Sequence, residues 1–421
     1  MTDILDELQW RGLVAQTTDP AALREALAAG PVTLYCGFDP TAPSLHHGHL
    51  VQLVVLRHLQ LAGHRVLPLV GGATGMIGDP RMSGERVLNS RETVAEWVDR
   101  LRSQISRFLD FDGDNPATMV NNLDWTGGLT AIDFLRDIGK HYRLGTMLAK
   151  DTVARRLESD QGISFTEFSY QILQGLDYLE LFRRYGCILQ TGGNDQWGNL
   201  LSGVELIRKA DQAQVHALTT PLITKADGTK FGKTEGGAVW LAPDMMSPYA
   251  FYQFWVNTDD ADVVRYVKVF TFRNRGEIAE LEQAVAERPA AREAQRALAY
   301  DVTVLVHGAG EADAVVAASQ ALFGRGELRD LDRATLAAAV AGLPTARASA
   351  AGLPVVDLMA ESGLVSSKAA ARRAIADGGA YLNNVKVLTE DAVVDQGDLL
   401  HGRWVLLRRG KRSLGVVEFG D

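Results

Sequence analysis

The stretch PVTLYCGFDPTAPSLHHGHLVQLVVLRHLQLAGHRVLPLVGG, residues 31–72, decides the fold class. Residues 31–40 form a short β-rich run that ends at a proline, and residues 45–63 have the apolar spacing of a helix that ends at a glycine. Residues 65–72 then predict a second strand. This β-α-β order is typical of a parallel sheet, in which ligands gather at the carboxyl ends of the strands.

Two segments further along the chain extend this pattern. Val94, Trp97, Leu101, Ile105 and Phe108 fall on one face of a predicted helix, and helical spacing continues to residue 181. The stretch CILQTGGNDQWGN, residues 187–199, returns to a strand, a turn and a helix start. We therefore predict an α/β fold, with a Rossmann-like parallel-sheet catalytic domain over residues 1–220 and a helical insertion over residues 85–180.

Three further parts follow this domain. Residues 221–340 contain a glycine-rich loop and then alanine-rich amphipathic segments, which predict an all-α domain. Residues 341–352, AGLPTARASAAG, are mostly small and carry one charge, so we expect a linker. Residues 353–421 predict a small α+β domain with a basic stretch, HGRWVLLRRGKRSLG.

Composition restricts the class of protein. The 421 residues include 46% hydrophobic and 23% charged side chains, which suits several soluble domains. A net charge of −9 argues against general coating of nucleic acid or membranes but permits a local basic patch. Two cysteines exclude a disulfide framework, and the acidic N-terminus and lack of a long apolar run indicate a cytoplasmic protein without a membrane segment.

Three histidines in TAPSLHHGHL, residues 41–50, lie where the first helix is predicted to begin. Ser44 is the expected N-cap, and Gly48 lets a ligand approach the first turn. His46 and His49 share a face, so imidazoles flank a helix N-terminus, which favours a phosphate group. A metal would need a third ligand, which the nearby sequence lacks, so we predict no metal site. Polar surface histidines are the remaining alternative.

The stretch ADGTKFGKTEGG, residues 226–237, is a second candidate for phosphate binding. It resembles the phosphate-binding loop of NTPases, but three residues instead of four separate its glycine from GKT. Its glycines instead predict a mobile loop with two ammonium groups, Lys230 and Lys233. Either the loop is simply solvated, or its lysines meet a triphosphate on the side opposite the helix start.

A third set of polar residues has helical spacing. Tyr170, Gln174 and Asp177 fall at positions i, i+4 and i+7 and so share one helix face. This stripe predicts either a solvent-facing helix or the polar floor of a pocket. Three further polar residues come from strand ends of the same sheet and could complete that pocket: Tyr35, Asp79 and Gln196.

These motifs resemble those of a known family. HHGH resembles the HIGH signature, and KFGKT the KMSKS signature, of class I aminoacyl-tRNA synthetases. Five stretches together resemble the bacterial tyrosyl-tRNA synthetase family over essentially the whole chain: LYCGFDPTAPSLHHGHL, GGATGMIGDP, GISFTEFSYQILQGLDY, GGNDQWGN and DGTKFGKTEGGAVWL. His47 departs from this pattern, because the family normally has an apolar residue there, and we expect a change in packing more than in chemistry.

The resemblance implies a role for each candidate residue. The amino acid would contact Tyr35 and Asp177 at its phenol, Asp79, Tyr170 and Gln174 at its ammonium, and also Gln196. ATP would contact Cys36, Gly37, Asp39, Gly48, His49, Gly193, Asp195, Lys230, Phe231 and Lys233. The charge on the departing pyrophosphate would be stabilised by Thr41, His46, His49, Lys230 and Lys233.

The implied reaction has two steps. The tyrosine carboxylate attacks the α-phosphorus of ATP to give tyrosyl-adenylate and pyrophosphate, and tyrosine then passes to the 3′-terminal ribose of tRNA(Tyr). ATP is a co-substrate, with Mg²⁺ expected beside it and no tightly bound cofactor, and catalysis should come from positioning and charge stabilisation. Tryptophanyl-tRNA synthetase or another HxGH nucleotidyltransferase is the alternative, although Tyr35 with Asp177 suits a phenol better than an indole.

The C-terminal part resembles the S-four-type RNA-binding domain of ribosomal proteins over residues 363–387. We expect a tRNA contact through phosphates and shape there. The family resemblance also implies a homodimer. The positive face for RNA would comprise Lys368, Arg372, Arg373, Lys386, Arg408, Arg409, Lys411 and Arg412.

Overall fold

The structure is a computed structural model, which describes residues 3–80, 84, 88–160, 162–229, 231–232, 237–410 and 413–420. The chain forms two compact units. The first comprises Met1–Met246 and Thr258–Leu298, and the second comprises Ser247–Asn257 and Ala299–Asp421. The helix α14 (Glu293–His307) runs from one unit into the other.

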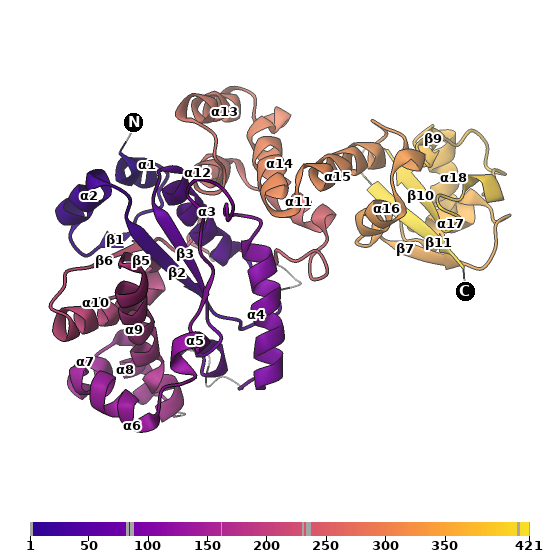
Figure 1. Cartoon of the computed structure of the whole chain (residues 1–421). Helices are drawn as coiled ribbons and strands as arrows, with labels where there is room; N and C mark the ends of the chain where they lie inside the picture. The colour runs from indigo at the N-terminus through magenta and orange to yellow at the C-terminus, as the bar shows by residue number, and fades with distance from the viewer. Residues whose placement is uncertain are drawn as a thin grey trace. The chain divides into compact units, whose positions relative to one another are not determined.

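A six-stranded sheet forms the centre of the first unit (Figure 1). Its order is β1 (Gln16–Thr17), β6 (His216–Thr220), β5 (Cys187–Gly193), β2 (Thr33–Phe38), β3 (Arg65–Val70) and β4 (Val120–Asn121). Only the β1–β6 pair is antiparallel among these neighbours. The chain runs from β2 to β3 and β4 on one side and to β5 and β6 on the other, so a crevice opens at the carboxyl ends of β2 and β5. The predicted parallel sheet is confirmed.

Helices connect and flank these strands. α3 (His47–Leu61) joins β2 to β3 and buries ten of its residues, which is why its sequence is apolar on most sides. α4 (Arg91–Ile105) buries one face, as its spacing predicts. The other helical segments are α1 (Ile4–Trp10), α2 (Pro20–Ala29), η1 (Thr74–Met76), α5 (Leu123–Thr126), α6 (Ala131–Asp133), η2 (Phe134–Ile138), η3 (Gly139–His141), α7 (Leu144–Leu148), α8 (Asp151–Leu157), α9 (Phe165–Tyr185), η4 (Asn194–Gln196), α10 (Trp197–Ala210), α12 (Asp260–Phe270), α13 (Arg275–Glu287) and η5 (Pro289–Ala291).

The predicted helical insertion contains one strand of the sheet. β4 pairs in parallel with β3 through Leu69 opposite Val120 and Val70 opposite Asn121. A strand of two residues shows no readable alternation, so the sequence pattern did not reveal it. α9 completes the insertion and packs with α10 on the sheet, in a core that includes Tyr35, Leu69, Val120, Leu179 and Leu206.

The second unit contains a five-stranded sheet and helices. The strand order is β7 (Thr345–Ala348), β11 (Ser413–Phe419), β10 (Trp404–Arg409), β8 (Ala380–Leu382) and β9 (Val385–Lys386), with β7 and β11 parallel and the other pairs antiparallel. Its helical segments are α11 (Pro248–Val256), α15 (Ala309–Leu322), η6 (Leu328–Asp330), α16 (Arg333–Val340), α17 (Val355–Glu361), α18 (Lys368–Ala376) and η7 (Gln396–Asp398). None of the helices in the described part of either unit is long and apolar enough to cross a membrane.

The predicted linker over residues 341–352 is not a free tether. Its residues 345–348 form β7, which pairs with β11 from Thr345 opposite Val416 to Ala348 opposite Phe419. One face of this sheet packs on α17 and α18, and the other face packs on α15 and α16. Residues 345–348, TARA, include no aromatic or large aliphatic side chain and so gave no strand signal, yet an edge strand needs only backbone pairing, so the prediction of a linker was wrong.

Candidate active site

Polar residues from several segments meet at the crevice of the first sheet. They come from the ends of β2, β3, β4 and β5 and from one face of α9. This is the edge at which a parallel sheet with reversed strand order binds ligands. Hydrogen bonds join the ends of β2 and β4 to α9. A second polar cluster, around Asp79, lies near enough for its charge to raise the pKa of Tyr170 further, after the larger effects of burial and of Asp39.

α3 begins differently from the prediction. Its N-cap is His46, because the His46 Nδ1 atom accepts a hydrogen bond from the Gly48 N–H at 3.0 Å. The His49 Nδ1 atom accepts in turn from the His46 N–H at 3.1 Å. Ser44 is buried, and its Oγ atom accepts from the Ala242 N–H at 3.0 Å. The predicted serine cap was therefore wrong, and a capping box of two imidazoles takes its place.

This capping box defines the chemistry of both rings. Because Nδ1 is an acceptor in His46 and in His49, the proton of each neutral ring is on Nε2. The rings stack with their centroids 4.0 Å apart. Burial, and then the neighbouring His46 and His47, lower the pKa of His49 well below its ordinary value, so His49 is neutral at physiological pH. Neutral N–H donors beside the amides of a helix start suit the oxygens of a phosphate group.

His47 connects the start of α3 to the second motif. Its ring lies edge-on to Phe231 with centroids 5.3 Å apart, and Phe231 also packs on Tyr266 of α12 at 4.6 Å. The His47 N–H donates to the Val239 carbonyl at 2.9 Å, so residues before and after the GKTEGG segment both meet the helix start. Two predicted phosphate ligands of this loop, Lys230 and Lys233, lie outside the described residues.

Tyr35 and Asp177 are both buried in the first unit. The Tyr35 hydroxyl has no hydrogen-bond partner among the described residues, whereas Asp177 accepts from Asn122 Nδ2 at 3.0 Å and Trp125 Nε1 at 2.8 Å. Burial first and the Asp177 charge second raise the pKa of Tyr35 well above its ordinary value. Burial also raises the pKa of Asp177 to about 7, against the effect of its two hydrogen bonds. Together they offer a donor and an acceptor to a ligand hydroxyl.

A series of hydrogen bonds joins Asp177 to Asp39. Asn122 Nδ2 donates to Thr74 Oγ1 at 2.9 Å as well as to Asp177, and Thr74 Oγ1 donates to Asp39 Oδ1 at 2.6 Å. The Tyr170 hydroxyl donates to Asp39 Oδ2 at 2.7 Å. The structure therefore brings together Asp39, predicted to contact ATP, and Tyr170 and Asp177, predicted to contact the amino acid. The alternative of a solvent-facing helix is wrong, because Tyr170 and Asp177 are buried.

Asp79 belongs to a second polar cluster. Gln196 Nε2 donates to Asp79 Oδ2 at 2.8 Å, and Asn199 Nδ2 donates to Asp79 Oδ1 at 3.2 Å. Lys150 Nζ lies 3.5 Å from Asn199 Oδ1, and burial lowers the pKa of Lys150 to about 8, which the Asp79 charge opposes. The Gln174 Oε1 atom is buried and has no partner within the described ranges. Asp79 and Gln174 thus provide acceptor oxygens, which an ammonium group requires.

The other predicted contacts of ATP and pyrophosphate differ in exposure. Cys36 is buried, with its Sγ atom 3.8 Å from Gln52 Oε1, and burial raises its pKa to about 12, so the thiol is protonated. Gly193 is half-buried. The described residues contain no group of three or more His, Cys, Asp or Glu residues arranged to hold a metal ion. Four predicted contacts are exposed: Gly37, Thr41, Gly48 and Asp195.

The predicted RNA-binding residues lie in the second unit, and several have protein partners. Lys368 pairs with Asp357 at 2.8 Å, and Arg372 pairs with Glu390 at 3.5 Å. The Arg408 guanidinium stacks over the Tyr381 ring at 3.8 Å. Lys411 and Arg412 lie outside the described residues, whereas the remaining three cations are exposed: Arg373, Lys386 and Arg409.

Sequence reasoning missed the residues that support the predicted ligands. Asn122 and Trp125 hold Asp177, and they follow β4, whose two residues gave no strand signal. Gln190 also escaped notice, although it pairs with Tyr35 on the neighbouring strand, and its buried Oε1 atom has no partner in the described structure. An amide inside an otherwise apolar strand, CILQTGG, was the signal for Gln190.

Comparison with known proteins shows which families and relatives this chain resembles. Residues 27–324 match the family described as tRNA synthetases class I (W and Y), and residues 335–417 match the Tyrosine--tRNA ligase SYY-like C-terminal domain. The chain is 66% identical to the tyrosine–tRNA ligase of Streptomyces coelicolor over 99% of both chains, and 59% identical to that of Thermobifida fusca over 99% of both.

Solved structures agree with these sequence matches. A C-terminally truncated mitochondrial tyrosyl-tRNA synthetase of Aspergillus nidulans matches with a TM-score of 0.71 at 33% identity, over 77% of this chain and 95% of that one. A tryptophanyl-tRNA synthetase of Encephalitozoon cuniculi matches with a TM-score of 0.54 at 13% identity, over 73% of this chain and 86% of that one. At that identity the second match shows a shared fold alone.

Proposed function

The chain belongs to the class I tRNA synthetases for tryptophan and tyrosine, and within them to the tyrosine–tRNA ligases, and from this premise we propose how its residues select tyrosine and activate it. Its reaction is the ATP-dependent joining of tyrosine to tRNA. The observation that carries the proposal is the buried Tyr35 hydroxyl, which lacks a partner in the described structure, close to the buried Asp177 carboxylate.

Selection of tyrosine rests on these two side chains. The substrate phenol would donate a hydrogen bond to Asp177 and accept one from Tyr35. An indole offers a donor but no acceptor, so tryptophan would leave the Tyr35 hydroxyl unpaired. Phenylalanine would leave both groups unpaired in a buried site, which is costly. Tyrosine–tRNA ligases are themselves the known example of such discrimination, so the pocket is expected to work without an editing site.

The substrate ammonium would lie between acceptor oxygens. Asp79, Gln174 and Tyr170 are the proposed ligands, and Gln196 and Asn199 support this arrangement by holding both Asp79 oxygens. Asp39 already joins Tyr170 to Thr74 through hydrogen bonds. Binding of the amino acid and of ATP would therefore meet at one hydrogen-bonded network, which aligns the carboxylate with the α-phosphorus.

Activation then requires charge stabilisation rather than a covalent intermediate. The attacking carboxylate is already an anion, so the Nε2–H groups of His46 and His49 and the start of α3 would stabilise the charge on the departing pyrophosphate. Contact of Phe231 with His47 supports a loop that carries Lys230 and Lys233 to the same phosphates. ATP would bring Mg²⁺, which supplies further charge neutralisation.

Two further properties follow from the family premise. We propose a homodimer, supported by large apolar side chains that the insertion exposes: Ile132, Leu135, Leu144 and Phe165. We also propose tRNA binding by the second unit and a cytoplasmic location, where the tRNA substrate is charged. Cys36 and Cys187 are both free, in agreement with a reducing compartment.

Exchange between ATP and pyrophosphate, measured with each of the twenty amino acids, tests the proposal. Tyrosine alone should support rapid exchange, and tyrosine should then appear on tRNA. Exchange supported equally by tryptophan would contradict the assignment of Tyr35 and Asp177. Exchange that requires no amino acid would refute the proposed reaction.

A further inference from the structure

Two neighbouring side chains of α12 bind the backbone just before the loop over residues 226–237. The Tyr266 hydroxyl donates a hydrogen bond to the Thr224 carbonyl at 2.9 Å, and Arg265 Nη2 donates to the same oxygen atom. Burial first, and the charge of Asp262 second, raise the pKa of Tyr266 to about 12, so the hydroxyl keeps the proton that it donates. One carbonyl group thus receives two hydrogen bonds from one helix.

The ring of the same tyrosine contacts the loop at a second point. Phe231 is buried, and its ring centroid lies 4.6 Å from that of Tyr266 and 6.1 Å from that of Phe270. His47, the first residue of α3, meets the Phe231 ring edge-on at 5.3 Å. The loop therefore places one aromatic side chain among rings of α12 and of the start of α3.

A tight turn connects these two points. The Lys225 N–H donates to the Thr229 carbonyl at 2.8 Å. Asp227 Oδ1 accepts from the Thr229 N–H at 2.8 Å and from the Thr229 hydroxyl at 2.6 Å. Lys225 directly follows the carbonyl that α12 binds, and Thr229 directly precedes Lys230 in the sequence. The turn thus joins the bound carbonyl to the backbone next to the first lysine of the loop.

The support that α12 offers is well fixed within the first unit. One face of this helix is buried, and it packs against α3. Arg265 Nη2 lies 3.0 Å from Asp262 Oδ1, and the Arg265 guanidinium lies 5.2 Å from the centroid of the Tyr266 ring. The buried Arg11 guanidinium also donates to three carbonyls at the end of the helix, those of Lys268 at 3.0 Å, Thr271 at 2.8 Å and Arg273 at 2.7 Å.

The composition of the loop explains why outside support matters. Gly228 and Gly232 have φ values of 81° and 79°, and glycine loses more conformational freedom than any other residue when a loop is ordered. A lysine ammonium lies at the end of a flexible stem, so its place depends on a well-placed backbone. A shift of about 1 Å in a catalytic group can slow a reaction about a hundredfold.

We propose that Tyr266 and Arg265 are positioning residues for the activation of tyrosine. They hold the Thr224 carbonyl and the Phe231 ring, and the backbone between these points carries Lys230. The inference rests on the proposed function, in which Lys230 stabilises charge on the departing pyrophosphate. Transfer of tyrosine to tRNA takes place after pyrophosphate has formed, so this second step should not depend on the two residues.

Single-turnover formation of tyrosyl-adenylate by the full chain tests this proposal. Tyr266→Phe removes the hydroxyl and keeps the ring, and Arg265→Met removes the guanidinium and keeps an apolar stem. Each variant should slow adenylate formation about fivefold, as loss of one hydrogen bond does. Tyrosine affinity, and transfer to tRNA from adenylate formed beforehand, should stay close to those of the wild type. An unchanged first step, or an equal fall in both steps, would overturn the proposal.

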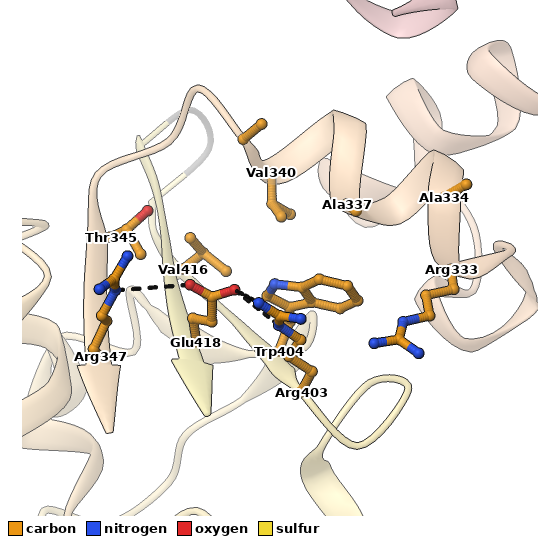
Figure 2. Close-up of a pocket in the computed structure, with 11 residues that line it drawn as sticks. Arg333, Ala334, Ala337, Val340, Thr345, Arg347, Arg403, Trp404, Val416 and Glu418 are labelled. Atoms are coloured by element: carbon orange, nitrogen blue, oxygen red, sulfur yellow. Dashed lines mark hydrogen bonds and ion pairs between the residues drawn. The ribbon is translucent and has the colours of Figure 1, made fainter. Parts of the chain in front are cut away.

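Each variant has a matched control in the second unit. Tyr300→Phe also removes one tyrosine hydroxyl, which donates to a carboxylate at 2.9 Å. The Arg403 side chain is 47% exposed, against 45% for Arg265, and it pairs with Glu418 at 2.7 Å. Its guanidinium lies 5.4 Å from the ring of the next residue, Trp404 (Figure 2). Tyr300→Phe and Arg403→Met should form adenylate within about twofold of the wild-type rate.

A double-mutant cycle with Lys230→Ala shows whether Tyr266 acts through the loop. In the Lys230→Ala background, Tyr266→Phe should slow adenylate formation less than about twofold, because residues that act as a unit are not additive. A full fivefold effect in that background would overturn the proposal and give Tyr266 a structural role only. A wild-type rate in Lys230→Ala alone would instead refute the proposed role of the lysine, and the inference with it.

Discussion

At the scale of single residues, removal of the Tyr35 hydroxyl should affect the use of tyrosine but not the stability of the fold. It is buried and has no hydrogen-bond partner in the described structure, so its removal takes no bond from the unliganded protein. We expect Tyr35→Phe to leave the free energy of unfolding unchanged or to raise it by about 1 kcal/mol. The same variant should lower kcat/KM for tyrosine about tenfold, because the substrate phenol loses a donor.

Urea unfolding and adenylate formation with tyrosine or phenylalanine measure these effects of Tyr35→Phe. Tyr178→Phe is the matched control, since the Tyr178 hydroxyl donates to the His216 carbonyl at 2.8 Å. That control should lose stability and keep its preference for tyrosine. A Tyr35→Phe protein that unfolds easily yet keeps full preference would reverse the assignment.

Asp177 should make stability depend on pH. Burial raises its pKa from 3.8 to about 7, so the folded protein holds this proton more tightly than the unfolded chain. The stability from this group is fully present below pH 3.8 and is lost as the pH rises through about 7. Between about pH 5 and pH 8 the loss amounts to about 2 kcal/mol.

Asp177→Asn removes this titration. We expect the free energy of unfolding of the variant, measured in urea at several pH values, to fall less than that of the wild type across this range. The comparison uses the slope against pH, because the new amide also changes the bonds from Asn122 and Trp125. Parallel curves for the two proteins would mean that Asp177 is ionised throughout.

At the scale of elements, the start of α3 contacts the loop that contains the stretch ADGTKFGKTEGG, residues 226–237. Gly232 has a φ of 79°, and a Cβ atom there would lie 2.0 Å from the His47 Cε1 atom. Gly232→Ala must therefore displace the His47 ring or the loop. We expect adenylate formation in single-turnover experiments to slow about tenfold or more, as misplaced catalytic groups do, while tyrosine affinity barely changes.

The double variant His47→Ala with Gly232→Ala distinguishes a clash from backbone strain. It removes the imidazole that the new methyl group would meet but keeps the unfavourable positive φ. Partial recovery of the rate is expected. No recovery would mean that the His47 contact is not what positions the loop, and an unchanged rate in Gly232→Ala itself would show that this contact does not matter for activation.

Elements with long periodic patterns could be predicted from the sequence. α3 begins within two residues of the expected position because its apolar run is long, and Tyr170, Gln174 and Asp177 share a face because helical spacing fixes it. The N-cap was missed because serine is the commoner cap and imidazoles are rare there. β4 and β7 were missed because short strands are defined by their pairing partners, which no local pattern contains.

The same dependence on distant pairing partners explains which residues of the site could not be predicted from the sequence. Asn122 and Trp125 reach Asp177 only because β4 joins the sheet beside β3, so their role depends on a contact distant in sequence. Tyr35 and Asp79 needed no such knowledge, since Tyr35 lies within a strand that has a clear pattern and Asp79 follows another. The cations of the second unit were identified as a group, but the ion pairs of Lys368 and Arg372 depend on folding.

At the scale of the whole molecule, the second unit is one sheet with a hydrophobic core on each face rather than two tethered domains. Leu336 and Val340 of α16 pack with Trp404, Leu406 and Val416 of the sheet. A chain that ends at residue 350 would lose that half of the core. We expect it to unfold at lower temperature and to bind a hydrophobic dye, because apolar surface of α15 and α16 becomes exposed. Tyrosine-dependent exchange should continue, since its residues belong to the first unit.

Because that truncation also disrupts the core, loss of tRNA charging in the truncated chain would not identify an RNA-binding surface. Substitutions in the full-length chain test which surface binds RNA. Arg373→Glu with Arg409→Glu reverses two exposed cations without removing core residues. We expect kcat/KM for tRNA to fall about tenfold or more, with the largest effect at low salt, while exchange stays unchanged. Arg288→Glu with Arg325→Glu carries the same change in charge at other exposed positions and should keep charging near the wild-type rate. Equal charging by both pairs would place the RNA contact on a different surface.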